Sequence, residues 1–109
     1  MIKLQEVFPI LADAVGGFVP SEEVREEALS YPFISDMVRF VNDRSYVGTS
    51  EAKQLAKLLE RLFVEGDHDV HDLAVDALET VSEQENGEII AQEFGPVTTQ
   101  VWKEARRAK

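Results

Sequence analysis

The most regular hydrophobic pattern in the chain lies in two neighbouring segments, which together predict a helical hairpin. Between these segments stand Gly66 and Asp67. We expect Gly66 to adopt the left-handed conformation that ends a helix, and Asp67 to accept a backbone hydrogen bond where the next helix starts. Such a short turn places the two helices antiparallel with their apolar faces together. Those faces are Leu55, Leu58, Leu59, Leu62 and Phe63 in the first helix, and Val70, Leu73, Ala74, Ala77, Leu78 and Val81 in the second.

Three further helical patterns precede the hairpin, and the third of them has a strong apolar stripe. Residues 2–15 carry a helical stripe, but Pro9 lacks an N–H and clashes with the preceding turn, so the segment forms either a kinked helix or two short pieces. A second helix starts after Ser21, a good N-terminal cap, and has a thin apolar face. A third starts near Pro32 and buries Phe33, Ile34, Met37, Val38 and Val41. Thr49 or Ser50 is expected to cap the first hairpin helix.

Two helices are expected after the hairpin. Asn86-Gly87 indicates a turn, after which residues 88–94 form a short helix that buries Ile89, Ile90 and Phe94. Gly95-Pro96 ends it and starts a last helix with Val97, Val101, Trp102 and Ala105 facing inward. No segment shows the alternation of a half-buried strand for more than a few residues. The fold class predicted is therefore all-α, with about six to seven helices in one compact domain, residues 1–109.

Composition narrows the class of protein. A chain of 109 residues with 44% hydrophobic residues can bury its own core. It has no cysteine, which excludes disulfides and thiolate metal sites. No stretch approaches the roughly 20 apolar residues of a membrane span, and polar residues interrupt any signal-peptide core near the N-terminus. We therefore expect a soluble, cytoplasmic protein without a membrane partner.

The charge is unevenly distributed along the chain. The net charge is −10, and residues 67–96 contain nine acidic residues and no lysine or arginine. Such a surface repels nucleic-acid phosphates and attracts basic partners. Residues 97–109 instead contain four basic residues and one acidic residue. We expect this basic tail to pair with the acidic block or to remain solvated, and we expect no direct binding of nucleic acid.

The second hairpin helix concentrates these acids on one side. Its acidic residues follow one another at steps of three or four, which places them along one face, opposite the apolar residues. Two interpretations stand at this point: a negative surface that binds a partner, or a solvated face that keeps the protein soluble. We call this row the acidic ridge: Asp69, Asp72, Asp76, Glu79 and Glu83.

The two histidines raise the question of a metal site. His71-Asp72 matches the centre of an HD phosphohydrolase motif, but the further histidine and aspartate that such a site needs on other helices are missing, since the only other histidine is His68. His68 with Asp72, or Asp67 with His71, offers two ligands, whereas catalytic zinc sites use three. No serine nucleophile motif or glycine-rich phosphate loop is present. We expect no enzyme activity, no metal and no cofactor.

Residues 67–78 resemble the second helix of a HEAT-type repeat. The matching features are the acidic start and then Val70, Ala74, Ala77 and Leu78. His71 stands where that repeat commonly has a basic residue. Only one such hairpin occurs, so the resemblance implies a HEAT-like domain and no long array.

A second resemblance covers roughly residues 55–105. The run Leu-Leu-Glu-Arg-Leu-Phe-Val-Glu-Gly-Asp at 58–67, with Glu79, Phe94-Gly95-Pro96 and Trp102, resembles a family of small bacterial immunity proteins against polymorphic or contact-dependent toxins. The resemblance implies a protein that binds and neutralises a cognate toxin, often a nuclease. With the charge pattern added, we expect the acidic ridge to cover the basic cleft of that toxin. Tyr46 is a candidate aromatic anchor, and Trp102 is expected to be a core residue.

Two other functions remain open from the sequence. The alternative is a helical adaptor or scaffold that binds a constitutive protein partner through an apolar patch. The third is an enzyme of HD or metal-dependent type.

Overall fold

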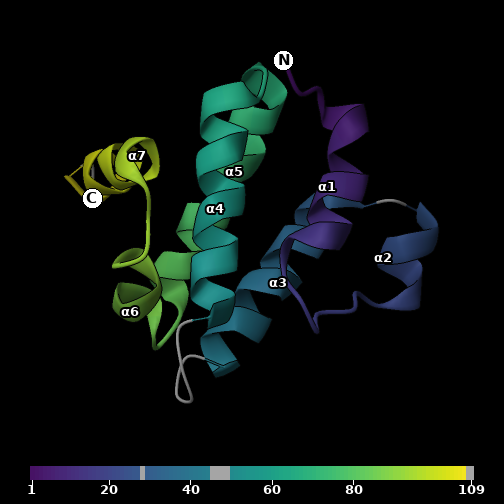
Figure 1. Ribbon diagram of the computed structural model, residues 1–109, viewed down its shortest axis with the longest axis horizontal. Coiled ribbons are helices and arrows are strands. Elements are labelled where there is room, and N and C mark those ends of the chain that lie inside the picture. The colour runs from purple at the N-terminus through teal and green to yellow at the C-terminus, as the bar shows by residue number, and fades with distance from the viewer. Residues whose placement is uncertain (28, 45–49, 108–109) are drawn as a thin grey trace.

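Helices make up nearly all of the regular structure in the computed structural model, which describes residues 1–27, 29–44 and 50–107 (Figure 1). These residues contain seven α-helices, one 3₁₀ helix and no strand, so the predicted all-α class is confirmed. The radius of gyration is 12.8 Å, close to the value of about 13 Å for a folded chain of this length. The helices are η1 (Leu4–Glu6), α1 (Val7–Ala14), α2 (Glu22–Glu27), α3 (Ser30–Arg44), α4 (Ser50–Glu65), α5 (His68–Glu83), α6 (Gly87–Ala91) and α7 (Pro96–Arg107).

The predicted hairpin is formed by α4 and α5, whose apolar faces are buried as expected. The Asp67 side chain accepts a hydrogen bond from the Val70 N–H at 3.0 Å and so caps α5. The prediction for Gly66 was wrong, because Gly17 is the only glycine of the described residues with a positive φ. Gly66 is instead needed for space: a Cβ there would lie 2.4 Å from the Leu62 carbonyl oxygen and 2.4 Å from Val70 Cγ1.

The N-terminus is bonded to this hairpin turn. The Ile2 N–H donates to the Glu65 carbonyl at 2.7 Å, and the Asp67 N–H donates to the Ile2 carbonyl at 2.8 Å. The two bonds form an isolated parallel bridge between Ile2 and Gly66. They satisfy backbone groups at the end of α4 and the start of α5 that the helices leave unpaired.

The N-terminal segment forms two pieces, one of the two arrangements expected from Pro9. η1 passes directly into α1, and Pro9 lies in the first turn of α1, where its missing N–H removes no helical hydrogen bond. Ser21 caps α2 as predicted, accepting from the Val24 N–H at 3.4 Å. Val24 is the buried residue of that short helix.

The centre of the molecule is the packing of α3 on α5, with α4 beside both. All five residues predicted to face inward on α3 are buried. Two buried asparagines then join the end of α3 to the turn after α5. The Asn86 N–H donates to Asn42 Oδ1 at 2.8 Å, and Asn86 Nδ2 donates to the Asn42 carbonyl at 3.0 Å.

The C-terminal helices differ from prediction in detail. α6 spans Gly87–Ala91 rather than residues 88–94, and such a short helix buries one side only: Ile90 is inside, whereas Ile89 is 38% exposed. Val97, in the first turn of α7, is 39% exposed, so the prediction that it faces inward was wrong. Trp102 is buried as expected, with its ring 5.6 Å from that of Phe94.

Buried residues from all seven α-helices form one hydrophobic cluster. None of the helices in the described ranges is long and apolar enough to cross a membrane. Tyr46, the aromatic anchor considered from the sequence, and Thr49, the alternative cap of α4, lie outside the described residues.

Candidate functional site

The acidic ridge lies on the outer side of α5. Asp69, Asp72, Glu79 and Glu83 are exposed, and Asp76 is half-buried. On the opposite side of the helix Val70, Ala74, Ala77 and Val81 are fully buried. This burial fixes the rotation of α5 and therefore holds the five carboxylates along one line. At 1.5 Å per residue the row is about 21 Å long.

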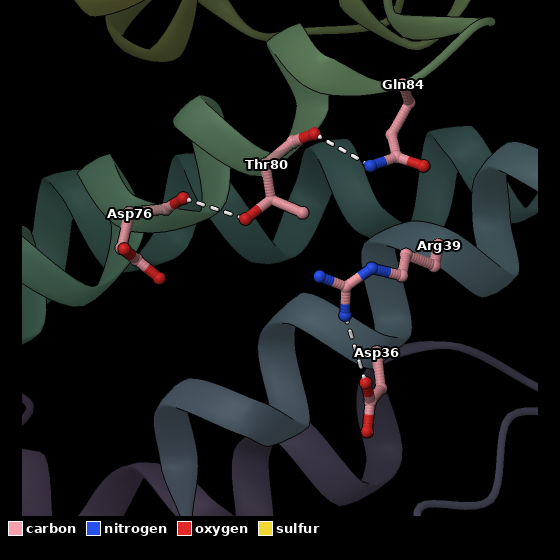
Figure 2. Close-up of polar contacts among 5 residues, drawn as sticks. All are labelled: Asp36, Arg39, Asp76, Thr80 and Gln84. Atoms are coloured by element: carbon pink, nitrogen blue, oxygen red, sulfur yellow. Dashed lines mark hydrogen bonds and ion pairs between the residues drawn. The ribbon is translucent and has the colours of Figure 1, made fainter.

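No lysine or arginine of the described residues forms an ion pair with the ridge. Arg39 lies on α3, the helix packed against α5. Its guanidinium donates to Asp36 on its own helix at 3.2 Å, as Figure 2 shows. The one ion contact of a ridge carboxylate among the described residues joins His68 Nε2 and Asp72 Oδ2 at 3.6 Å.

The backbone of the ridge is held independently of its carboxylates. Thr80 Oγ1 donates to the carbonyl oxygen of Asp76 at 3.2 Å, and Gln84 Nε2 donates to the carbonyl oxygen of Thr80 at 3.1 Å (Figure 2). The Asp76 side chain takes no part in these bonds. A substitution of the carboxylate therefore leaves this hydrogen-bonding pattern in place.

Tyr31 adds an aromatic side chain beside the ridge. It lies in the first turn of α3 and is 41% exposed. Partial burial, followed by the charges of Asp72, Asp76 and Asp69, raises the pKa of the Tyr31 hydroxyl above its usual value. No local pattern in the sequence indicates this neighbour, because its position depends on the packing of α3 against α5.

The histidines do not form a metal centre with other residues. Among the described residues, no group of three or more histidine, aspartate or glutamate side chains is arranged to hold a metal ion. His68 contacts Asp72, whereas the His71 ring packs edge-on against Phe63 with centroids 5.0 Å apart. The two histidines of the His68–Asp72 and Asp67–His71 pairs thus have different neighbours, since the His71 ring packs against Phe63 of α4.

In the described part of the basic C-terminal segment, Arg106 pairs with the acidic block. Arg106 forms an ion pair with Glu88 of α6, and its guanidinium lies over the Trp102 ring at 5.2 Å from the centroid. This contact agrees with one of the two outcomes expected for the tail. It uses none of the ridge carboxylates.

A carboxylate that the sequence analysis missed holds α7 in place. Glu60 of α4 accepts hydrogen bonds from the Thr98 N–H at 2.9 Å, the Thr98 hydroxyl at 2.9 Å and the Val97 N–H at 3.2 Å. Burial raises the pKa of Glu60, but these hydrogen bonds outweigh it and lower the pKa below its usual value. Gly95 makes room for the carboxylate, since a Cβ there would lie 2.7 Å from Glu60 Cδ.

Comparison with protein-family models, with curated proteins and with solved structures finds no match for this chain.

Proposed function

We propose that this protein is an immunity protein that binds and neutralises a cognate bacterial toxin. The observation that carries the proposal is the ridge itself: five carboxylates in a rigid row, without a lysine or arginine partner in the described part of the chain. Like charges at this spacing destabilise a helix by a few tenths of a kcal/mol per pair. Binding of a basic partner to the ridge would offset this electrostatic cost.

The toxin expected on these grounds is a nuclease. The cleft of a nuclease must be positive because it binds a phosphate backbone. A rigid row of carboxylates fits such a cleft electrostatically, speeds the encounter and excludes the nucleic acid. Tyr31 supports the same surface, since exposed tyrosines beside charged groups are frequent anchors of protein interfaces. The protein then acts by occlusion and performs no chemistry.

The test uses the protein encoded by the open reading frame immediately upstream of this gene. A C-terminal fragment of that protein, about 150–250 residues long, which is a usual span for one domain, is expressed with and without the protein described here. We expect the fragment alone to stop growth, and the wild-type protein to restore growth and to co-purify with the fragment.

The ridge is then tested by charge reversal. Asp72→Lys, Asp76→Lys and Glu79→Lys together should weaken binding at least tenfold and abolish rescue. The control reverses three acids elsewhere, Glu26→Lys, Glu27→Lys and Glu104→Lys. These residues are exposed near helix C-termini, where positive charge is favourable, and they change the net charge equally.

Binding that survives reversal of the ridge, or that falls equally in both triple variants, would remove the ridge from the mechanism. A harmless fragment, or a lethal one that this protein does not neutralise, would reject the immunity function.

The adaptor function is the second candidate, because the structure has apolar hollows beside α4, away from the ridge. It differs from the first in its prediction for the same experiment: a partner that co-purifies without being toxic and whose binding is insensitive to reversal of the ridge.

A further inference from the structure

Asn86 and Gly87 stand where the turn after α5 enters α6, and both residues are buried. The chain has two asparagines, and the other is Asn42. Asparagine is a chemically labile residue. It is most labile before glycine, because a residue without a side chain leaves its own backbone nitrogen free to attack the asparagine side chain. The turn thus holds a reactive pair at a buried position.

The fold needs both residues of this pair. A Cβ at Gly87 would lie 2.3 Å from the Val81 carbonyl oxygen, so no other residue fits there. Asn86 uses both its N–H and its Nδ2 to bind Asn42, whose carbonyl belongs to the last turn of α3 and has no partner within that helix. An aspartate at position 86 would lose the second bond, because a carboxylate only accepts.

The same contacts hold the pair in an unreactive geometry. At Asn86 ψ is 21°, which rotates the Gly87 nitrogen away from the Asn86 side chain. The Gly87 N–H donates to the Gln84 carbonyl at 3.2 Å, and Asn86 Nδ2 donates to the Asn42 carbonyl at 3.0 Å. The nitrogen reaches Asn86 Cγ only after both bonds break and the backbone rotates about Cα–C.

We propose that Asn86-Gly87 is a self-modification site that the fold keeps closed and that reacts when the turn between α5 and α6 opens. Opening here is a local event, since α6 has five residues and its first turn is joined to α3 through Asn42. The site uses none of the ridge carboxylates, so the inference is independent of the toxin proposal.

The reaction needs only water. The Gly87 backbone nitrogen loses its proton to solvent base and attacks Asn86 Cγ. The Cγ–Nδ2 bond breaks, Nδ2 leaves as ammonia, and a five-membered succinimide remains. Water then opens the ring at one of its two carbonyl carbons. Opening at Cγ gives aspartate, and opening at the main-chain carbonyl gives isoaspartate, whose backbone runs through the former side chain.

Neither product restores the joint with α3. Aspartate at position 86 turns a carboxylate oxygen toward the Asn42 carbonyl at a site that is 6% exposed, and burial of such an unpaired charge is unfavourable. Isoaspartate adds an atom to the backbone and so displaces the Asn86 N–H from Asn42 Oδ1. A molecule that has opened and reacted is therefore permanently changed at this turn.

The experiment follows the conversion of each asparagine in the full chain by mass spectrometry of proteolytic peptides, at neutral and mildly alkaline pH. Chromatography separates the aspartate and isoaspartate products. Heavy-oxygen water labels each product with one oxygen. Folded wild-type protein is compared with the same chain unfolded in urea, and hydrogen exchange measures how strongly the fold protects the Gly87 N–H.

In the unfolded chain, Asn86 should react at least about tenfold faster than Asn42, which precedes Asp43, and should give mostly isoaspartate. In the folded protein, the reaction at Asn86 should be slowed at least about tenfold, by a factor that matches the protection of the Gly87 N–H. Both rates should rise with pH, because the attacking nitrogen must lose a proton.

Two variants test whether the opening is local. Asn42→Ala removes the acceptor of the Asn86 N–H and should speed the reaction in the folded protein at least about threefold. The matched control is Glu60→Ala, which removes a different set of hydrogen bonds, those to the start of α7, and should leave the rate at Asn86 nearly unchanged. Circular dichroism confirms that each variant is folded.

Three results would overturn the proposal: equal rates at Asn86 in the folded and unfolded chain, a product without isoaspartate, or equal acceleration in both variants. The last would mean that Asn86 reacts only after global unfolding. If Asn42→Ala does not fold, the comparison of reaction rate with hydrogen exchange in the wild-type protein decides alone. A slowing far greater than the protection of the Gly87 N–H would then exclude opening of this turn as the gate.

The consequence for the fold is tested with Asn86→Asp, which equals one product of the reaction. It should lower the urea midpoint of unfolding, whereas Gln92→Glu, which adds the same charge at an exposed position just after α6, should change the midpoint much less. Equal midpoints for Asn86→Asp and the wild-type protein would show that the modification leaves the joint intact.

Discussion

At the scale of single residues, Glu60 is the side chain whose chemistry the structure defines best. Three hydrogen bonds to the start of α7 hold it as a carboxylate. A helix N-terminus has unpaired N–H groups and a partial positive charge, and both favour an anion there. Glu60 supplies from another helix the cap that α7 does not receive from the residue before it, Gly95, which has no side chain.

Glu60→Gln should therefore lower the free energy of unfolding by about 1–2 kcal/mol at neutral pH. Because the pKa of Glu60 is lower in the folded protein than in the unfolded chain, its contribution is present above the usual pKa of about 4.3 and is lost as the pH falls through the folded value. Urea unfolding of both proteins between about pH 7 and pH 3 should show the difference shrinking below about pH 4. A difference independent of pH would show that the charge of Glu60 is unimportant.

Gly95 and Glu60 should be energetically coupled. A Cβ at Gly95 would lie 2.8 Å from Glu60 Oε1 and would push the carboxylate away from Thr98. We expect Gly95→Ala to cost about 1–2 kcal/mol in the wild-type protein but less than about 0.5 kcal/mol in a Glu60→Ala background. A double-mutant cycle by urea unfolding measures this; additive losses would mean that Gly95 serves some other purpose.

At the scale of helices, the packing of α3 on α5 places Tyr31 in the field of the ridge. Asp72→Asn with Asp76→Asn should lower the pKa of the Tyr31 hydroxyl toward its usual value of about 10, without reaching it, since the burial remains. An NMR titration of carbon-labelled tyrosine rings follows each tyrosine separately. Glu26→Gln with Glu27→Gln serves as the control and should leave the pKa unchanged. An equal change in both variants would show that Tyr31 senses only the net charge.

Helices whose own sequence carries a strong stripe were predicted well. The faces of α3, α4 and α5 follow from local spacing, and Asp67 caps α5 because a cap acts within one turn. The line of the ridge follows from the same spacing. Short helices were predicted less well: α6 makes little more than one turn, so spacing alone does not show which isoleucine is buried.

Contacts between residues far apart in the chain had no local signal. Glu60 reads in the sequence as an exposed acid on α4, and only the fold brings it to Thr98. The Asn42–Asn86 pair joins two segments that separately look like a helix end and a turn. The local pattern predicts for Gly66 the usual role of a glycine at a helix end, whereas its actual role depends on the close approach of Val70. The sequence thus indicated where the charges lie and missed the neighbours that fix their surroundings.

At the scale of the whole molecule, the net charge of −10 and the unpaired ridge should reduce stability. Asp76→Asn, Glu79→Gln and Glu83→Gln together remove like-charge repulsion and negative charge from the C-terminal half of α5. They should raise the free energy of unfolding by about 0.5–1.5 kcal/mol at low salt. The gain should largely disappear near 1 M salt, where the screening length is about 3 Å.

The control is Asp69→Asn at the start of α5, where a negative charge is favourable, so it should not stabilise. Urea unfolding at low and high salt gives all of these values. Stabilisation that persists at high salt would point to helix propensity instead of charge.

The bridge between Ile2 and Gly66 also sets an order of events. Ile2 is synthesised well before the turn between α4 and α5, and both of its backbone partners flank that turn. The α4–α5 hairpin closes through local contacts, whereas the bridge must close a long loop, which is slower and entropically costlier. We therefore expect the α4–α5 hairpin to form first, and the segment around Ile2 to dock onto it as a late step of folding.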